Sequence, residues 1–309
     1  MSVMVHNTAS GGGSSVIIDG TEFKGTLELN ATTNPPNNVS TLPYKFYYDL
    51  AVVYDNEIHI LGDYLNDSLT AHYKWNGSSW TQISTSLPYD CSEGSSVVYK
   101  NEIHILGGFA DPSTGHYKWN GSTWRSVSTI PYEFYRGSAT VYDNGIHILG
   151  GQSNNVAHYK WDGSAWTSVS TLPYNFYRGS AVVYNNEIHI LGSKNSSYRT
   201  SHYKWDGSAW TSVSTLPYVF YTSPAVVHND EIHILGGDHD SGNIDDIPTR
   251  HYKWNDQSMS WKEEVYKLPY FFYCGSAVVY DDEIHILGTM HSKYTQSHYS
   301  LGHEILIEG

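Results

Sequence analysis

SAVVYNNEIHILGSKNSSYRTSHYKWDGSAWTSVST, residues 180–215, contains four short segments in which apolar and polar residues alternate. Asn185-Asn186 separates the first segment from the second, and Asp206-Gly207 separates the third from the fourth. Such Asn, Asp and Gly pairs between alternating segments are strong signals for tight β-hairpin turns. The stretch therefore predicts four antiparallel strands in one small sheet.

The same unit occurs six times along the 309-residue chain. The string IHILG begins at six positions whose successive separations are 45, 43, 42, 44 and 52 residues, and HY follows every copy. A period of about 43 residues with four strands in each unit is typical of the blades of a β-propeller. We therefore predict an all-β protein in which residues 39–309 form one six-bladed β-propeller of four-stranded antiparallel blades.

A Gly pair and a spaced Tyr–Trp pair recur in the units. Three units have a Gly pair directly after the second strand, and a Tyr is followed by Trp seven residues later, as in Tyr159 and Trp166. The Gly pairs are Gly107-Gly108, Gly150-Gly151 and Gly236-Gly237, and the other units have Gly62-Asp63, Gly192-Ser193 and Gly288-Thr289. In these features the chain resembles the kelch-repeat β-propellers. The resemblance implies the fold of residues 39–309 and little about function, because one fold carries many functions.

Residues 1–38 lie outside the repeats. Met1 to Ser15 ends in a Gly- and Ser-rich run that is typical of a linker, and Val16 to Asn30 has the pattern of a small hairpin. We expect this region to be a short N-terminal extension that attaches the chain to a larger assembly. The sixth unit lacks the Trp strand, so its outer strand must come from another segment. We expect His303–Glu308 to supply it, with Val39–Tyr44 as the alternative.

Composition and charge exclude several classes of function. The chain has 17 Lys and Arg against 31 Asp and Glu, without a basic stripe, so nucleic acid is not an expected partner. No apolar run approaches the roughly 18 residues of a membrane span. The N-terminus lacks the features of a secretory signal, and the two cysteines fit a reducing compartment. We expect a cytoplasmic protein, or a virion-associated one that folds in the cytoplasm.

Comparison of the six units separates packing positions from candidate ligand positions. Columns that are identical in all units, such as the His of IHI and of HY, are explained by contacts within the propeller, most simply hydrogen bonds between neighbouring blades, so we assign them no metal. The loops between second and third strands vary from 7 to 14 residues, whereas the hairpin turns at the other end are short. The connections between blades share a face with these loops. We call it the variable face and expect ligands there.

One column in the connections between blades varies from unit to unit. It directly precedes the innermost strand, so its side chains should point toward the mouth of the central channel. Kelch proteins that bind ligands often use this position, frequently with Arg, and by this resemblance Arg136 and Arg178 would hold a carboxylate or sugar hydroxyls. The candidate ligand-binding residues are Tyr48, Glu93, Arg136, Arg178, Thr222 and Cys274 in this column, and Tyr135, Tyr177, Tyr221 and Tyr273 directly before it.

The sequence favours a binding protein over an enzyme. It contains no motif for a nucleophile, a phosphate loop or a catalytic metal, and we predict no cofactor. The acidic loop Asp238–Asp246 departs from the spacing of a calcium loop, and calcium binding there is left open. The leading hypothesis is a non-enzymatic module that recognises a glycan or a protein surface, for example a phage or prophage tail adhesin. The alternatives are a sugar mutarotase or epimerase that uses Glu93 at the channel mouth, and a cytosolic protein–protein adaptor.

Overall fold

The computed structural model describes residues 36–62, 70–195, 197–237, 249–264, 267–290 and 293–301, together with the backbone of three strands nearer the N-terminus. The chain divides into two compact units, Pro35–Gly302 and a smaller unit made of Met1–Asn34 with His303–Gly309. The acidic loop Asp238–Asp246 and the segment His303–Glu308 lie outside the described residues. In the described part of the chain, no helix is long and apolar enough to cross a membrane.

The smaller unit contains one three-stranded antiparallel sheet with the strand order β1-β2-β3. Its strands are β1 (Val3–His6), β2 (Ser15–Ile18) and β3 (Thr21–Lys24). The β2–β3 hairpin falls at the start of the region where the sequence has a hairpin pattern.

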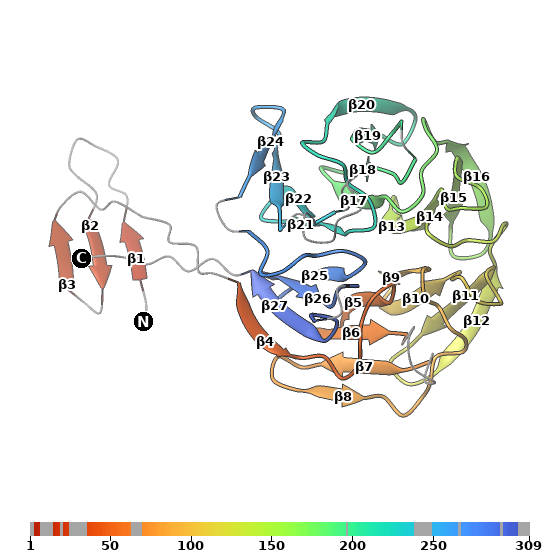
Figure 1. Ribbon diagram of the computed structural model, residues 1–309, viewed down its shortest axis with the longest axis horizontal. Helices are drawn as coiled ribbons and strands as arrows, with labels where there is room; N and C mark the ends of the chain where they lie inside the picture. Colours follow the sequence, from red (N-terminus) through yellow and green to blue (C-terminus); the bar gives the residue numbers. More distant parts are fainter. Residues whose placement is uncertain are drawn as a thin grey trace. The chain divides into compact units, whose positions relative to one another are not determined.

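The larger unit is a six-bladed β-propeller of four-stranded antiparallel sheets, as the repeats predict (Figure 1). The first blade has β5 (Leu50–Tyr54), β6 (Glu57–Leu61), β7 (His72–Trp75) and β8 (Trp80–Gln82). The second has β9 (Ser95–Tyr99), β10 (Glu102–Leu106), β11 (Gly115–Trp119) and β12 (Trp124–Thr129). The third has β13 (Ser138–Tyr142), β14 (Gly145–Leu149), β15 (Ala157–Trp161) and β16 (Trp166–Thr171).

The remaining blades complete the ring. The fourth has β17 (Ser180–Tyr184), β18 (Glu187–Leu191), β19 (Ser201–Trp205) and β20 (Trp210–Thr215). The fifth has β21 (Ala225–His228), β22 (Glu231–Leu235), β23 (His251–Asn255) and β24 (Ser260–Glu263). The sixth has β25 (Ser276–Tyr280), β26 (Glu283–Leu287), β27 (Ser297–Leu301) and β4 (Asn37–Thr41). The first strands of neighbouring blades contact one another, and β25 contacts β5, so the ring is closed.

The sixth blade is closed by the N-terminal strand β4, so the prediction that His303–Glu308 supplies its outer strand is wrong. β4 pairs with β27 in antiparallel register, and the two lie side by side in Figure 1 although they come from opposite ends of the propeller sequence. Ser40 of β4 occupies the same position as the serines of other fourth strands, Ser128, Ser170 and Ser214, and it makes the same hydrogen bonds. Its hydroxyl lies 2.8 Å from His298 Nδ1 and accepts a hydrogen bond of 2.9 Å from Trp80 Nε1 in the first blade.

The hydrophobic core lies between neighbouring blades, in six clusters of buried side chains. In one of them, Trp161 of the third blade and Ile146 beside it pack against Val97 and Leu106 of the second blade. Phe134, from the connection between these two blades, is fully buried in the same cluster. Each blade therefore depends on its neighbour for its core, which makes the closed ring the stable unit.

The repeated histidines form hydrogen-bonded pairs within a blade, and in the second, third, fourth and sixth blades a serine links the pair to a Trp of the next blade. In the third blade, His147 Nδ1 lies 2.8 Å from His158 Nε2, and His158 Nδ1 lies 2.7 Å from Ser170 Oγ. Trp210 Nε1 of the fourth blade donates a hydrogen bond of 3.0 Å to the same hydroxyl. The expectation that each histidine bonds directly across a blade interface is thus wrong, because the hydrogen-bond partners of the histidines lie on adjacent strands of the same blade. The hydrogen bond that crosses the interface joins the Ser hydroxyl and the Trp indole.

The first blade lacks this link, and the segment that follows Trp80 in its fourth strand is one residue longer than in the third blade. Its sequence from Trp80 is WTQISTSLPY, where the third blade has WTSVSTLPY from Trp166, so Ser86 is the insertion. The β-bulge that places Ser170 opposite His158 in the third blade is not present in the pairing of β7 with β8, and Ser84 is exposed. Among the described residues, His72 Nδ1 and Trp124 Nε1 consequently have no hydrogen-bond partner, although both atoms are buried.

Candidate functional site

The variable column that the sequence singles out forms one closed ring around the channel mouth. Its six residues share the same left-handed backbone conformation, with φ between 57° and 59°. Each backbone N–H donates to the carbonyl of the column residue in the preceding blade, at 2.6 to 2.8 Å, and the series returns to its start. We call these residues the mouth ring: Tyr48, Glu93, Arg136, Arg178, Thr222 and Cys274.

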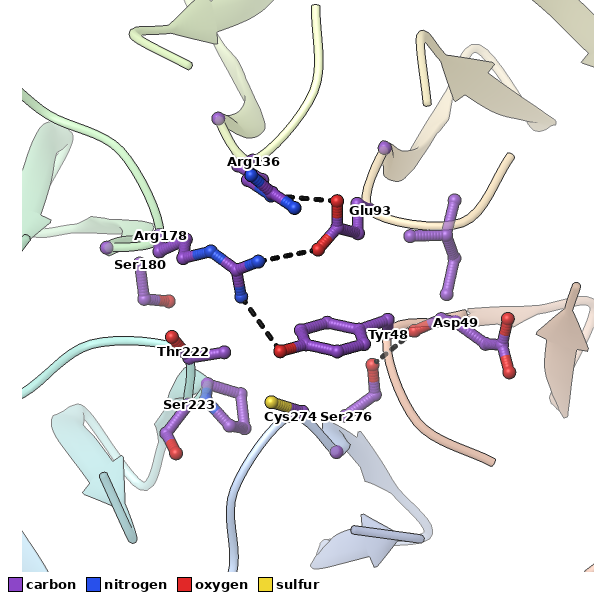
Figure 2. Close-up of a pocket in the computed structure, with 16 residues that line it drawn as sticks. Tyr48, Asp49, Glu93, Arg136, Arg178, Ser180, Thr222, Ser223, Cys274 and Ser276 are labelled. Carbon is purple, nitrogen blue, oxygen red and sulfur yellow. Dashed lines mark hydrogen bonds and ion pairs between the residues drawn. The ribbon is translucent and has the colours of Figure 1, made fainter. Parts of the chain in front are cut away.

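This conformation is costly for the residues that adopt it, since positive φ is unfavourable for side chains with a Cβ and most of all for a β-branched residue such as Thr222. Tight packing at the next position helps to impose it. A Cβ on Gly137, which follows Arg136, would lie 2.4 Å from the ring of the buried Phe134. The chain therefore turns sharply between the buried Phe and the innermost strand. As Figure 2 shows, the mouth-ring side chains point toward the channel axis.

A cavity of about 190 Å³ lies at the mouth ring. All six mouth-ring residues line it, together with the one or two residues that follow each of them in the chain. Polar groups from this second layer include Asp49, Ser180, Ser223 and Ser276. Ser276 donates a hydrogen bond of 3.2 Å to the carbonyl of Asp49 and so connects the sixth and first blades. A cavity with several polar groups from different blades is suited to a polar ligand.

Glu93 joins the two arginines of the mouth ring. Its carboxylate accepts hydrogen bonds from Arg136 Nε at 2.8 Å and from Arg178 NH2 at 2.7 Å, each oxygen taking one (Figure 2). The Glu93 side chain is only 5% exposed, against 10% for Arg178 and 22% for Arg136. Counting these three side chains, the cluster carries one uncompensated positive charge. Arg136 also donates to the side-chain oxygen of Gln152.

Tyr48, the neighbour of Glu93 in the mouth ring, completes the cluster. Arg178 NH1 donates a hydrogen bond of 3.0 Å to the Tyr48 hydroxyl, and the guanidinium carbon lies 4.9 Å from the centre of the tyrosine ring. Burial raises the pKa of Tyr48 to about 12, with a further contribution from Cys274. Burial likewise raises the pKa of the Cys274 thiol to about 12, so both groups are protonated at neutral pH. The mouth ring thus offers hydroxyl and guanidinium groups, and a thiol that is a poor nucleophile.

The four tyrosines that precede the mouth ring do not line the cavity. Tyr135, Tyr177 and Tyr273 are half-buried and Tyr221 is buried. Tyr135 lies beside the guanidinium of Arg136, 5.7 Å from its ring centre, and Tyr221 lies under Arg199 at 5.6 Å. The structure therefore gathers the six column residues into one site and leaves the other four candidates, Tyr135, Tyr177, Tyr221 and Tyr273, outside the cavity wall.

Sequence comparison missed Asp49, Gln152 and Phe109 as neighbours of the site. Asp49 stands where four of the other five units have Gly, and this difference between the units could have identified Asp49 as a candidate site residue. Gln152 and Phe109 lie in loops of the variable face that share no pattern between units, so no comparison of repeats could single them out. In the described portion of the chain, no group of three or more His, Cys, Asp or Glu side chains is arranged to hold a metal ion.

The fold and the site define a class, the six-bladed β-propellers with a polar cavity at one channel mouth. Comparison with solved structures finds this fold in YjhT, a kelch-repeat protein, with a TM-score of 0.70 and 14% sequence identity over 85% of this chain and 95% of that one. In all, 361 solved chains match, so the fold is widespread and does not discriminate between functions. No protein-family model and no curated protein matches the sequence.

Proposed function

We propose that this propeller is a non-enzymatic binding module that recognises a glycan or a protein surface through its variable face, with the mouth ring at the centre of the site. The observation that carries the proposal is a contrast inside the mouth ring. All six positions have one backbone conformation and one pattern of backbone hydrogen bonds, whereas their side chains are of five types. Because the fold specifies the backbone there and not the side chain, side-chain identity is available for recognition.

The charge of the mouth ring supports a ligand with carboxylate or hydroxyl groups. Glu93 orients both arginines and compensates one of their charges, which leaves one positive charge beside the cavity. A guanidinium that is fixed before the ligand arrives loses less conformational entropy on binding than a free one. Arg136, the more exposed of the two, is the side chain that a ligand on the variable face can reach.

A sugar mutarotase or epimerase at the same position is the alternative. Such an enzyme needs an acid–base group within reach of the bound sugar. Both oxygens of Glu93 already accept hydrogen bonds from arginines, and the side chain is almost completely buried. These contacts favour an orienting role for Glu93 and the binding function over the catalytic one.

The smaller unit fits attachment of the propeller to a larger assembly. Its strands β1 to β3 belong to a compact unit of their own, separate from the residues that form the binding face. A phage or prophage tail is one setting for such an arrangement, and a cytosolic protein–protein adaptor is the other that we keep. The two differ in partner, since the first requires a glycan or surface receptor and the second a soluble protein.

A glycan array read beside a pulldown with the full chain tests the proposal. Substitution Arg136→Ala should weaken binding of whatever ligand is found by about tenfold or more, the loss expected for one hydrogen bond to a charged group. Stability should change little, because Arg178 still pairs with Glu93.

The matched controls lie on the opposite face of the propeller. Asn186→Ala and Ser208→Ala change exposed turn residues and should leave binding intact. If these variants lose binding while Arg136→Ala retains it, the binding site lies on the opposite face of the propeller and not at the mouth ring. A wild-type chain that captures neither a glycan nor a protein would refute the proposal altogether.

A further inference from the structure

Phe109 is an exposed aromatic side chain next to the mouth ring. It lies in the loop between β10 and β11 on the variable face, and 57% of its surface is open to solvent. Two other large hydrophobic side chains are similarly exposed among the described residues, Met259 and Met290. An isolated exposed side chain is normally unremarkable, so the case for Phe109 depends on what surrounds it.

Phe109 is held by one backbone contact and two contacts of its ring. Its backbone N–H donates a hydrogen bond of 2.8 Å to the carbonyl of Ser92, in the adjacent connection between blades. Tyr135 packs edge-to-face against the ring, with 5.8 Å between centres and an interplanar angle of 77°. The guanidinium carbon of Arg136 lies 5.5 Å from the ring centre. The aromatic ring is thus already ordered before a ligand arrives, so little side-chain entropy is lost when a ligand packs against it.

Hydrogen-bonding groups surround this ring. Arg136 directs Nε to Glu93 and NH1 to the side-chain oxygen of Gln152. The backbone N–H of Gln152 donates to the carbonyl of Tyr135 at 3.0 Å, which holds the loop after β14 against the loop before β13. Since its oxygen faces Arg136, the Gln152 amide keeps its N–H donors for another partner. We call Phe109, Tyr135, Arg136 and Gln152 the Phe109 patch.

We propose that the Phe109 patch is a subsite for a neutral pyranose ring of a glycan, a specificity that rests on the binding function proposed above. A pyranose has a face of axial C–H bonds that packs on an aromatic ring, and equatorial hydroxyls at its edge that hydrogen-bond to amide and guanidinium groups. The patch presents these two features side by side. A protein partner is less well matched, because a stable protein interface buries roughly 1,200 Å² or more around several apolar anchors. Near the mouth ring, the described residues offer one exposed ring.

Saturation-transfer NMR with the full chain tests this subsite, with methyl β-D-glucopyranoside and methyl β-D-galactopyranoside as probes. We expect transfer to be strongest at the ring C–H protons. Phe109→Ala should reduce the affinity about tenfold, as for other aromatic stacking contacts, and Phe109→Trp should retain it. Met290→Ala, which removes another exposed apolar side chain from a loop of the variable face, should have no effect. Wild-type protein that gives no transfer to either probe, or Phe109→Ala with unchanged affinity, would overturn the proposal.

The two proposals fail in distinguishable ways. If Phe109→Ala still binds the array glycan while Arg136→Ala does not, the binding function holds and the pyranose subsite is wrong. If the chain binds only a soluble protein, the subsite is likewise wrong and the adaptor role gains support. If neither substitution affects any captured ligand, the binding function at the mouth ring fails as well.

Discussion

Ser170 should be worth far more to the stability of the propeller than Ser84, although both occupy the same place in their repeats. Ser170 Oγ satisfies His158 Nδ1 and Trp210 Nε1, and His158 is completely buried. Substitution Ser170→Ala leaves a buried ring nitrogen without a partner, at about 1–3 kcal/mol, and removes a second hydrogen bond worth about 1 kcal/mol. The expected loss is about 2–4 kcal/mol of unfolding free energy. For the exposed Ser84, the same substitution should cost less than about 0.5 kcal/mol.

Deletion of Ser86 extends this comparison. Without the inserted residue, Ser84 should move to the position that Ser170 has in the third blade and bond to His72 Nδ1 and Trp124 Nε1. Two hydrogen bonds at about 0.5–1.5 kcal/mol each predict a gain of about 1–3 kcal/mol. Ser84→Ala should then become as costly in the deletion background as Ser170→Ala is in the native chain.

Urea unfolding followed by circular dichroism measures all these variants, provided that the transitions remain two-state. The decisive quantity is the coupling between the deletion and Ser84→Ala, which a double-mutant cycle gives directly. If Ser84→Ala costs the same in both backgrounds, the inserted residue does not set the register of the first blade, and the reasoning from the repeats is refuted.

Three further predictions follow from burial and protonation. Burial lowers the pKa of the paired histidines, to about 4 for His147 and about 3 for His158, from an ordinary value of 6.5. Because the unfolded chain binds protons that the folded chain does not, the free energy of unfolding should fall as the pH drops below 6.5, by about 2 kcal/mol per histidine at pH 5. The native near-ultraviolet circular dichroism signal should therefore be lost at about pH 5. A native spectrum at pH 4 would contradict this prediction. The buried, protonated thiols of Cys91 and Cys274 should resist Ellman's reagent at pH 8 until urea is added, and rapid reaction of either in the native protein would mean that it is accessible. Trp205→Ala, at a buried ring, should cost about 3–5 kcal/mol and Trp210→Ala, at a half-buried one, clearly less; equal costs in urea unfolding would show that burial does not separate the two columns.

The sequence was sufficient for the features that depend on neighbouring residues. Hairpin turns such as Asn185-Asn186, where both residues have positive φ, follow from local residue preferences. The period of the repeats then determines the blade count. The mouth ring was found because it precedes the innermost strand and its residues differ between units.

Other features required the three-dimensional structure because they depend on long-range competition. Two segments were available to close the sixth blade, and the pairing of β4 with β27, where Ser40 lies beside His298, is a contact over most of the chain that the repeat pattern does not specify. The bridging position of Glu93 depends on the lengths and directions of side chains from three blades, which no spacing in the sequence encodes. The same holds for Phe109, whose exposure depends on the path of an unrepeated loop.

The pairing of β4 with β27 has a consequence for the synthesis of the chain. Thr41 pairs with Ser297, 256 residues later (297 − 41), so β4 leaves the ribosome long before its partner is made. At about 5–20 residues per second, the interval is roughly 13–50 s, during which the first blade has no neighbour on one side. The edge of β4 and the exposed side of that blade are then available to chaperones or to a second nascent chain. Formation of the closed ring, and with it the backbone hydrogen bond of the mouth ring between Tyr48 and Cys274, therefore cannot occur before β27 has been synthesised.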